Sequence, residues 1–155
     1  SAKLSEQALS KATNRIQPLE IARVNIKKTI EALRDMKELS TSLDVCEQAA
    51  KAKALRSLTE SGVVLSRVSE IILKFKDVPA QRALVRLDEM RQRNNAVREE
   101  LRKIVLSEFQ AQCDAIGNDA PGEMHRIMLR SACTVADELG VSVQAEVIGL
   151  FIGRR

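Results

Sequence analysis

The chain has 155 residues, of which 45% are hydrophobic and 30% charged but only 2% aromatic, and its formal net charge is +4. Leu, Ile, Val and Ala at steps of three and four residues are typical of long packed helices. The composition therefore predicts an all-α fold, an elongated antiparallel helical bundle or coiled-coil rod with a short C-terminal helical hairpin. No apolar run reaches the roughly 18 residues that a membrane-spanning helix needs.

The positive charge is concentrated in one segment. Residues 74–103 contain nine basic and five acidic residues, which accounts for the whole net charge of +4. A basic strip can bind nucleic acid or anionic lipid. Because acids are interspersed, the sequence favours a solvated helix face, and we expect no nucleic-acid binding. Binding through Arg82, Arg86 and Arg93 stays as an alternative, whereas the same acids disfavour a membrane-surface helix.

The first predicted helix covers residues 5–49, with apolar side chains on one face. Proline breaks a helix interior but suits its first turn, so the strong part of the helix is expected to begin near Pro18. A helix from there to Ala49 is roughly 48 Å long and needs a partner helix along much of its length. We expect a partner-binding surface at Leu19, Ile26, Ile30, Leu33, Leu39 and Leu43. The alternative is packing inside the chain, against Leu87, Val97 and Leu101. The two alternatives are equally open for the C-terminal half of the helix, and partner binding is favoured toward its start.

Two further long helices are predicted, at residues 51–76 with Gly62 inside and at residues 79–113. Asp77-Val78-Pro79 predicts a tight turn between them, since the residue before proline leaves the helical region. The second of these helices has a regular heptad pattern at Leu87, Met90, Asn94, Val97, Leu101, Ile104 and Glu108, beside a second stripe at Leu84, Val105 and Phe109. Asn94 is either a register-setting seam residue or an exposed residue at the edge of the stripe.

Gly, Asn, Asp and Pro cluster at residues 116–122 and predict a loop. Short helices are expected at about 121–139 and 142–152, with Gly140 as the stop between them, and a small antiparallel pair is the simplest arrangement. We therefore expect two regions. Residues 1–115 form a long-helix coiled-coil region, and residues 116–155 form a short helical pair that starts a rod continuing beyond this chain. The apolar C-terminal sequence suggests a fragment of a longer protein.

No catalytic, cofactor-binding or metal-binding constellation is recognisable, so we expect no enzyme activity. The only histidine, His125, is expected to be a packing or surface residue. Three cysteines lie far apart without CxxC spacing, which predicts buried free thiols: Cys46, Cys113 and Cys133. Neighbouring charges predict surface ion pairs of Asp88 with Arg91, Glu89 with Arg93, and Glu99 with Lys103.

From about Leu19 onward, several patches resemble the N-terminal part of the vacuolar protein sorting-associated protein 53 family. Members of this family are subunits of the Golgi-associated retrograde protein complex and of its endosomal variant. The similar patches are IKKTIEAL at 26–33, KFKDVP at 74–79, LSEF at 106–109 and SACTVADEL at 131–139, followed by a helix that ends in Phe-x-x-Arg. Their order and spacing agree with the family as well.

The resemblance implies a non-enzymatic subunit of a multisubunit vesicle-tethering complex in endosome-to-trans-Golgi retrograde transport. It implies that the N-terminal coiled coils of the subunits bundle together, with SNARE proteins and small GTPases as further partners. It also implies a cytoplasmic protein, peripheral at trans-Golgi network and endosome membranes. A subunit of a sister tethering complex, like the exocyst or COG, is an alternative, and a basic helical nucleic-acid-binding scaffold is a less favoured one.

Overall fold

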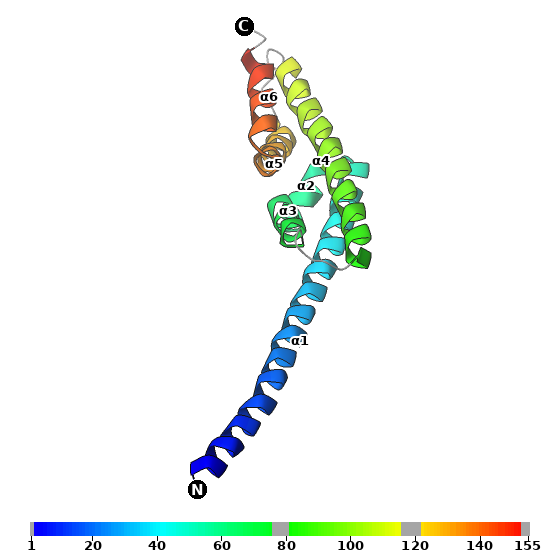
Figure 1. Cartoon of the computed structure of the whole chain (residues 1–155). Coiled ribbons are helices and arrows are strands. Elements are labelled where there is room, and N and C mark those ends of the chain that lie inside the picture. Colours follow the sequence, from blue (N-terminus) through cyan, green and yellow to red (C-terminus); the bar gives the residue numbers. More distant parts are fainter. Residues whose placement is uncertain (1, 76–80, 116–121, 153–155) are drawn as a thin grey trace. The chain divides into compact units, whose positions relative to one another are not determined.

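The computed structural model describes residues 2–75, 81–115 and 122–152, and it gives only the backbone at 81–84 and His125. The described residues contain helices and turns but no strand, which confirms the all-α prediction. The helices are α1 (Ala2–Lys51), α2 (Leu55–Glu60), α3 (Leu65–Lys74), α4 (Gln81–Ala115), α5 (Glu123–Leu139) and α6 (Val141–Ile152) (Figure 1). The expected turn at Pro79, most of the expected loop at 116–122, and the side chains of Arg82, Leu84 and His125 lie outside the described residues.

The chain divides into two compact units, which we call unit 1 (Ser1–Glu38) and unit 2 (Leu39–Arg155). Helix α1 contributes residues to both units. The boundary expected near residue 115 lies inside unit 2, because α5 and α6 both pack on α4. The two short C-terminal helices therefore share a core with the residues before them.

Helix α1 continues through Pro18, so the expectation that the strong helix begins there is wrong. An interior proline lacks one backbone hydrogen bond and costs about 3 kcal/mol in a helix. All described residues from Ala2 to Glu31 are exposed, so the proline ring meets no packed neighbour.

The end of α1 is fixed by a left-handed residue, Lys53, whose φ is 52°. The N–H of Ala54 donates to the carbonyl of Ala49 at 2.9 Å, and the N–H of Lys53 donates to the carbonyl of Ala50 at 3.1 Å. This pair of bonds is the Schellman motif, which satisfies carbonyls left free at a helix end. The chain then reverses into α2.

The sequence suggested that Gly62 lies inside a helix. In the structure it lies in the turn between α2 and α3. Its φ is +70°, in the left-handed region where glycine is favoured because it lacks a side chain. The expected single helix at 51–76 is therefore two short helices. Residues of both, Leu55, Leu58 and Leu65, enter the same core.

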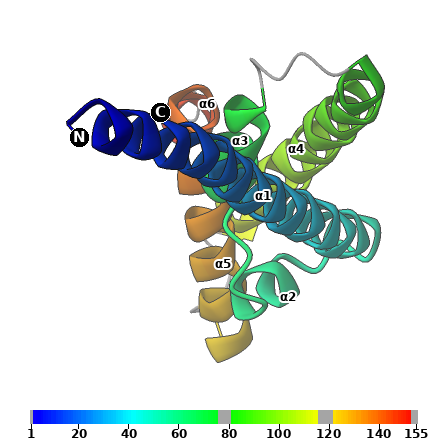
Figure 2. The same ribbon diagram turned by 60° about the horizontal axis from the view of Figure 1, so that its bottom comes forward.

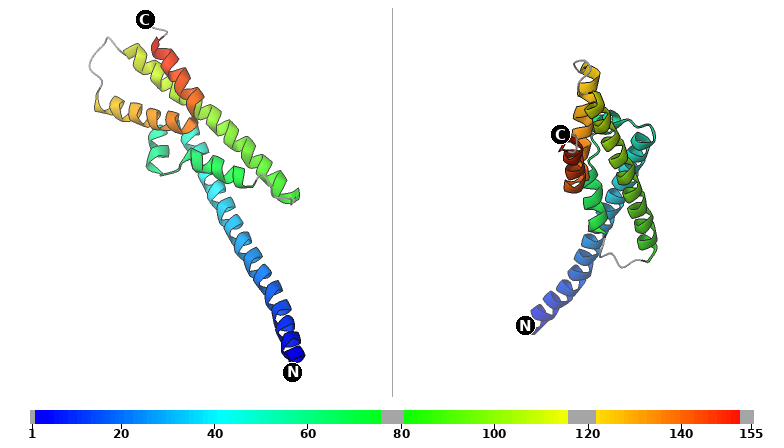
Figure 3. Two further views of the ribbon diagram at one scale, coloured as in Figure 1. Left: turned by 60° about the vertical axis from the view of Figure 1, so that its left-hand side comes forward. Right: turned by 90° about the horizontal axis from the view of Figure 1, so that it is seen from above.

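Helix α4 lies beside the C-terminal part of α1 within unit 2 and contacts α3, α5 and α6 (Figures 1 and 3). Up to Leu101 its buried positions follow the predicted heptad, but beyond it they are Val105, Phe109 and Cys113 rather than Ile104 and Glu108. Four-residue steps rotate the buried stripe around the helix, because one turn takes 3.6 residues. This rotation directs the C-terminal half of α4 toward α5 and α6.

The core of unit 2 receives side chains from every one of the described helices in that unit. One cluster of buried residues in this core contains Cys46, Ala49, Leu55, Leu58, Leu65, Val97, Leu101, Val105, Phe109, Ala132, Val135, Ala136, Leu139, Val143 and Val147. The ring of Phe109 meets Phe151 of α6 edge to face, with ring centroids 6.0 Å apart. α5 covers α2 as well as α4 (Figure 2).

Helices α5 and α6 meet at a steep angle rather than lying side by side along their length (Figures 1 and 3). Gly140, with a φ of +109°, makes the corner between them. The expected antiparallel pair is thus replaced by a corner. Both α5 and α6 pack on α4.

Asn94 is buried, with 7% of its surface exposed. It is therefore a residue of the packed stripe of α4 and not an exposed residue at the edge of that stripe. Its Oδ1 atom accepts no hydrogen bond from a described residue. A buried polar atom without a partner costs roughly 1–3 kcal/mol. Asn94 therefore sits on the packed face of α4 at the expense of stability.

Candidate partner-binding surface of helix α1

Unit 1 presents large apolar side chains to solvent. Leu9, Ile16, Leu19, Ile26, Ile30 and Leu33 are between 44% and 71% exposed. No described residue of unit 1 is buried, and only Ala32, Asp35 and Met36 are partly covered. Burying one Leu or Ile side chain stabilises a protein by about 1.5–3 kcal/mol, so this surface has a large unused capacity for binding.

These side chains follow a strict heptad over about seven turns of the helix. Alternating steps of three and four residues connect Leu9, Ala12, Ile16, Leu19, Arg23, Ile26, Ile30 and Leu33, and we call this set the α1 seam. A period of 3.5 residues is the pattern with which helices wind around one another in coiled coils. The structure adds Leu9, Ala12 and Ile16 to the surface predicted from the sequence, which had been placed after an expected break at Pro18.

The heptad register of the seam does not continue into unit 2. Its next positions are Lys37, Ser40, Asp44 and Glu47, which are polar or charged. The residues of α1 that unit 2 buries are instead Leu39, Leu43, Cys46 and Ala49. The single stripe read from the sequence is therefore two stripes in different registers.

The six predicted partner-binding residues divide between the two units, four in unit 1 and two in unit 2. Leu39 and Leu43 are 0% exposed and lie in unit 2. For these two residues the structure shows the alternative, packing inside the chain. Leu19, Ile26, Ile30 and Leu33 are all exposed. Their role as a partner surface stays a prediction.

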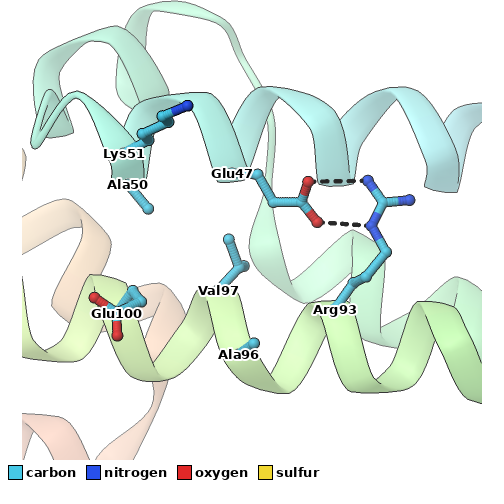
Figure 4. A pocket seen from close by; sticks show the side chains of 7 residues that line it. All are labelled: Glu47, Ala50, Lys51, Arg93, Ala96, Val97 and Glu100. Atoms are coloured by element: carbon cyan, nitrogen blue, oxygen red, sulfur yellow. Dashed lines mark hydrogen bonds and ion pairs between the residues drawn. The ribbon is translucent and has the colours of Figure 1, made fainter.

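Unit 2 has an open groove between α1 and α4, with a volume of about 340 Å³ (Figure 4). Its lining consists of the aliphatic residues Ala50, Ala96 and Val97 and the charged residues Glu47, Lys51, Arg93 and Glu100. Of the charged residues that line it, Glu47 pairs with Arg93, and Glu100 pairs with Lys103 at 3.1 Å. The lining contains no Ser, Thr, Cys or His side chain.

The basic segment of α4 is used to hold unit 2 together. Arg93 donates to both carboxylate oxygens of Glu47, at 2.6 and 3.1 Å (Figure 4). It also donates to Asp44 at 2.7 Å. The hydrogen bond with Glu47 raises the pKa of the Arg93 guanidinium. The sequence predicted Glu89 as the partner of Arg93, and this is wrong, because the pair forms between helices and not along one helix.

Arg98 of α4 and Glu138 of α5 form contacts at the C-terminus of α5 and the N-terminus of α3. The guanidinium of Arg98 donates to the carbonyls of Glu138 and Leu139, at 3.3 and 3.1 Å, in the last turn of α5. The Glu138 carboxylate accepts the N–H of Leu65 at 3.1 Å, at the first turn of α3. A cation at the C-terminus of a helix and an anion at the N-terminus both complement the helix dipole. Neither role could be read from the sequence, since the partners are far apart in it.

Further ion pairs lie on the surface of α4. Asp88 binds Arg91 at 3.3 Å, as predicted. Arg102 binds Glu99 at 2.7 Å and Glu146 of α6 at 2.6 Å, and its hydrogen bond lowers the pKa of Glu99. Lys103 pairs with Glu100 rather than with Glu99, which Arg102 occupies.

The three cysteines are free thiols, as predicted, but only Cys46 and Cys113 are buried, whereas Cys133 is exposed. Burial raises the pKa of Cys46 to about 11, and Glu138 and Glu47 add to this shift. Partial burial, and then Asp137, raises the pKa of Cys133. Raised values keep these sulfurs protonated and poorly nucleophilic at neutral pH.

Two further features were searched within residues 2–75, 81–115 and 122–152. No group of His, Cys, Asp or Glu side chains there is placed to hold a metal ion. None of the helices in this part of the chain is long and apolar enough to cross a membrane.

Comparison with known proteins gives one family. The family model described as "Vps53, N-terminal" matches residues 1–155. A search of curated proteins and a search of solved structures give no match. The match covers the whole chain, including both the α1 seam and the helices of unit 2. The chain therefore belongs to the Vps53 N-terminal family.

Proposed function

We propose that this chain is a non-enzymatic subunit of a vesicle-tethering complex in endosome-to-trans-Golgi retrograde transport, and that it enters the complex through the α1 seam. Family membership supports the first part, because Vps53 proteins are subunits of a multisubunit tethering complex. The proposal places the protein peripherally at trans-Golgi network and endosome membranes. SNARE proteins and small GTPases are further proposed partners.

One observation carries the second part: the seam is a coiled-coil heptad whose apolar side chains are exposed. Six Leu and Ile side chains of unit 1 lie at seam positions and are between 44% and 71% exposed. Monomeric proteins rarely leave a contiguous apolar patch of this kind open to water. An amphipathic helix of a partner subunit is the simplest surface that fits a seam of heptad spacing.

The test is co-purification of the full-length protein with its partner subunits after Ile26→Asp. A charge at the centre of a coiled-coil seam removes apolar burial and leaves an unpaired carboxylate, so we expect association to fall at least tenfold. Ile21→Asp is the matched control. Ile21 and Ile26 are both 61% exposed on the same helix, but Ile21 lies outside the seam.

Circular dichroism of both variants checks that helix content is unchanged. Loss of the partner subunits with Ile26→Asp and their retention with Ile21→Asp would support the seam as the assembly surface. Retention of the partner subunits with both variants would refute it.

A further inference from the structure

The charges beside the α1 seam are mostly of one sign. In a heptad, the positions that flank the seam are the ones whose charges meet the partner helix. Between Leu9 and Leu33 and directly after it, these flanking positions are Thr13, Arg15, Glu20, Ala22, Lys27, Thr29 and Arg34. Three of them are basic and only one is acidic, and the seam itself contains a fourth basic residue, Arg23.

The single acid of this set is engaged within the helix. Glu20 pairs with Arg23, with 3.6 Å between its Oε2 and the guanidinium Nη1. Arg15, Lys27 and Arg34 are exposed and have no ion-pair partner among the described residues. The acids Glu31 and Asp35 lie at outer heptad positions, away from the seam. The surface that a partner meets is therefore apolar at its centre and basic along its edges.

We propose that the helix covering the α1 seam carries Leu or Ile at its own seam positions and Asp or Glu at its flanking positions. This inference rests on the proposed function and adds the chemistry of the partner. Opposite charges at flanking positions attract across a coiled coil and like charges repel, so they select among helices with similar apolar seams. A parallel second copy of this chain is disfavoured, because it places Arg23 against Arg23 within the seam.

The test uses the whole 155-residue chain and two synthetic helices of about four heptads, the seam length needed here. Both peptides have Leu and Ile at seam positions. One has Glu at every flanking position and the other has Lys. We expect the Glu peptide to bind about tenfold more tightly at low salt, and the preference to shrink at about 1 M salt, where the Debye length is about 3 Å.

Two double variants of equal charge change locate the effect. Lys27→Glu with Arg34→Glu alters the flanking positions, and we expect it to reverse the preference between the peptides. Lys11→Glu with Lys28→Glu alters outer positions of the same helix, and we expect it to leave the preference in place. Isothermal titration calorimetry measures the affinities, and circular dichroism checks that each variant is helical.

Three outcomes would overturn the proposal. Equal affinity for both peptides would show that charge does not select the partner. Failure of the Glu peptide to bind would show that a helix with acidic flanking positions does not cover the α1 seam. If the chain alone is a dimer in sedimentation equilibrium and Ile26→Asp converts it to a monomer, a second copy of the chain covers the seam. None of these decides the proposed function, which depends on whether Ile26→Asp removes the partner subunits.

Discussion

Leu33 and Leu39 lie less than two turns apart on the same helix, yet Leu33 is 65% exposed and Leu39 is 0% exposed. The residue type and the apolar spacing are alike in unit 1 and unit 2. What differs is the set of neighbours: α2 to α6 supply a core for residues 39–51, and nothing in the described chain buries residues 2–31. The comparison teaches that apolar periodicity specifies a face for packing but not the molecule that supplies the other face.

The largest expected effect tests this difference directly with the same substitution in both units. Leu43→Ala removes a fully buried side chain and leaves a cavity, so we expect the free energy of unfolding to fall by about 2–5 kcal/mol. Leu33→Ala removes an exposed side chain, and we expect a change within about 0.5 kcal/mol. Urea unfolding of the isolated chain, followed by circular dichroism, measures both. Equal losses would contradict the division into a packed unit and an open one.

A second pair of variants compares arginines. Arg98→Ala leaves the carbonyls of Glu138 and Leu139 without their side-chain donor, and we expect a loss of about 1–3 kcal/mol. Arg23→Ala removes only an exposed pair with Glu20, and we expect a change of at most about 0.5 kcal/mol. The same urea experiment applies. A loss with Arg23→Ala as large as with Arg98→Ala would argue against the terminal contacts of Arg98 as the source of stability.

Alkaline pH should weaken unit 2 through Cys46. Its pKa in the fold is about 11, above its ordinary value of 9.0, so the folded chain holds the proton more tightly. The contribution to stability is complete below pH 9 and is lost as the pH rises toward 11, by up to about 1.4 kcal/mol per pH unit. Cys46→Ala lacks this contribution, and the difference between the two pH profiles isolates it. Parallel profiles from pH 8 to about 10.5 would show that the thiol does not titrate as expected.

The smallest expected effect is a gain in stability. Asn94→Leu replaces a buried side chain whose Oδ1 has no hydrogen-bond partner, and we expect unfolding to cost about 1 kcal/mol more. Asn25→Leu makes the same change at an exposed position of unit 1 and controls for helix propensity. A net loss with Asn94→Leu, after subtraction of this control, would mean that the amide is satisfied in solution.

The sequence by itself determined the helical class, because apolar side chains recur at helical spacing and aromatic residues are nearly absent. It also predicted the seam positions Leu19, Ile26, Ile30 and Leu33, since a heptad is a local pattern. Gly140 was correctly predicted as a helix stop. Pro18 and Gly62 were misread, because each residue is compatible with two local structures and the surroundings choose between them.

Only the tertiary structure decided which apolar residues the chain keeps for itself. Leu39 and Leu43 follow the same spacing as Leu33, but they are buried where the short helices after α1 fold back to form a core. The pairing of Arg93 with Glu47, and of Arg98 with the end of α5, depends on which helices become neighbours. Periodicity is a property of one helix, whereas burial and ion pairing are properties of two or more. That is the physical reason why the sequence predicted the faces of the helices but not their contacts.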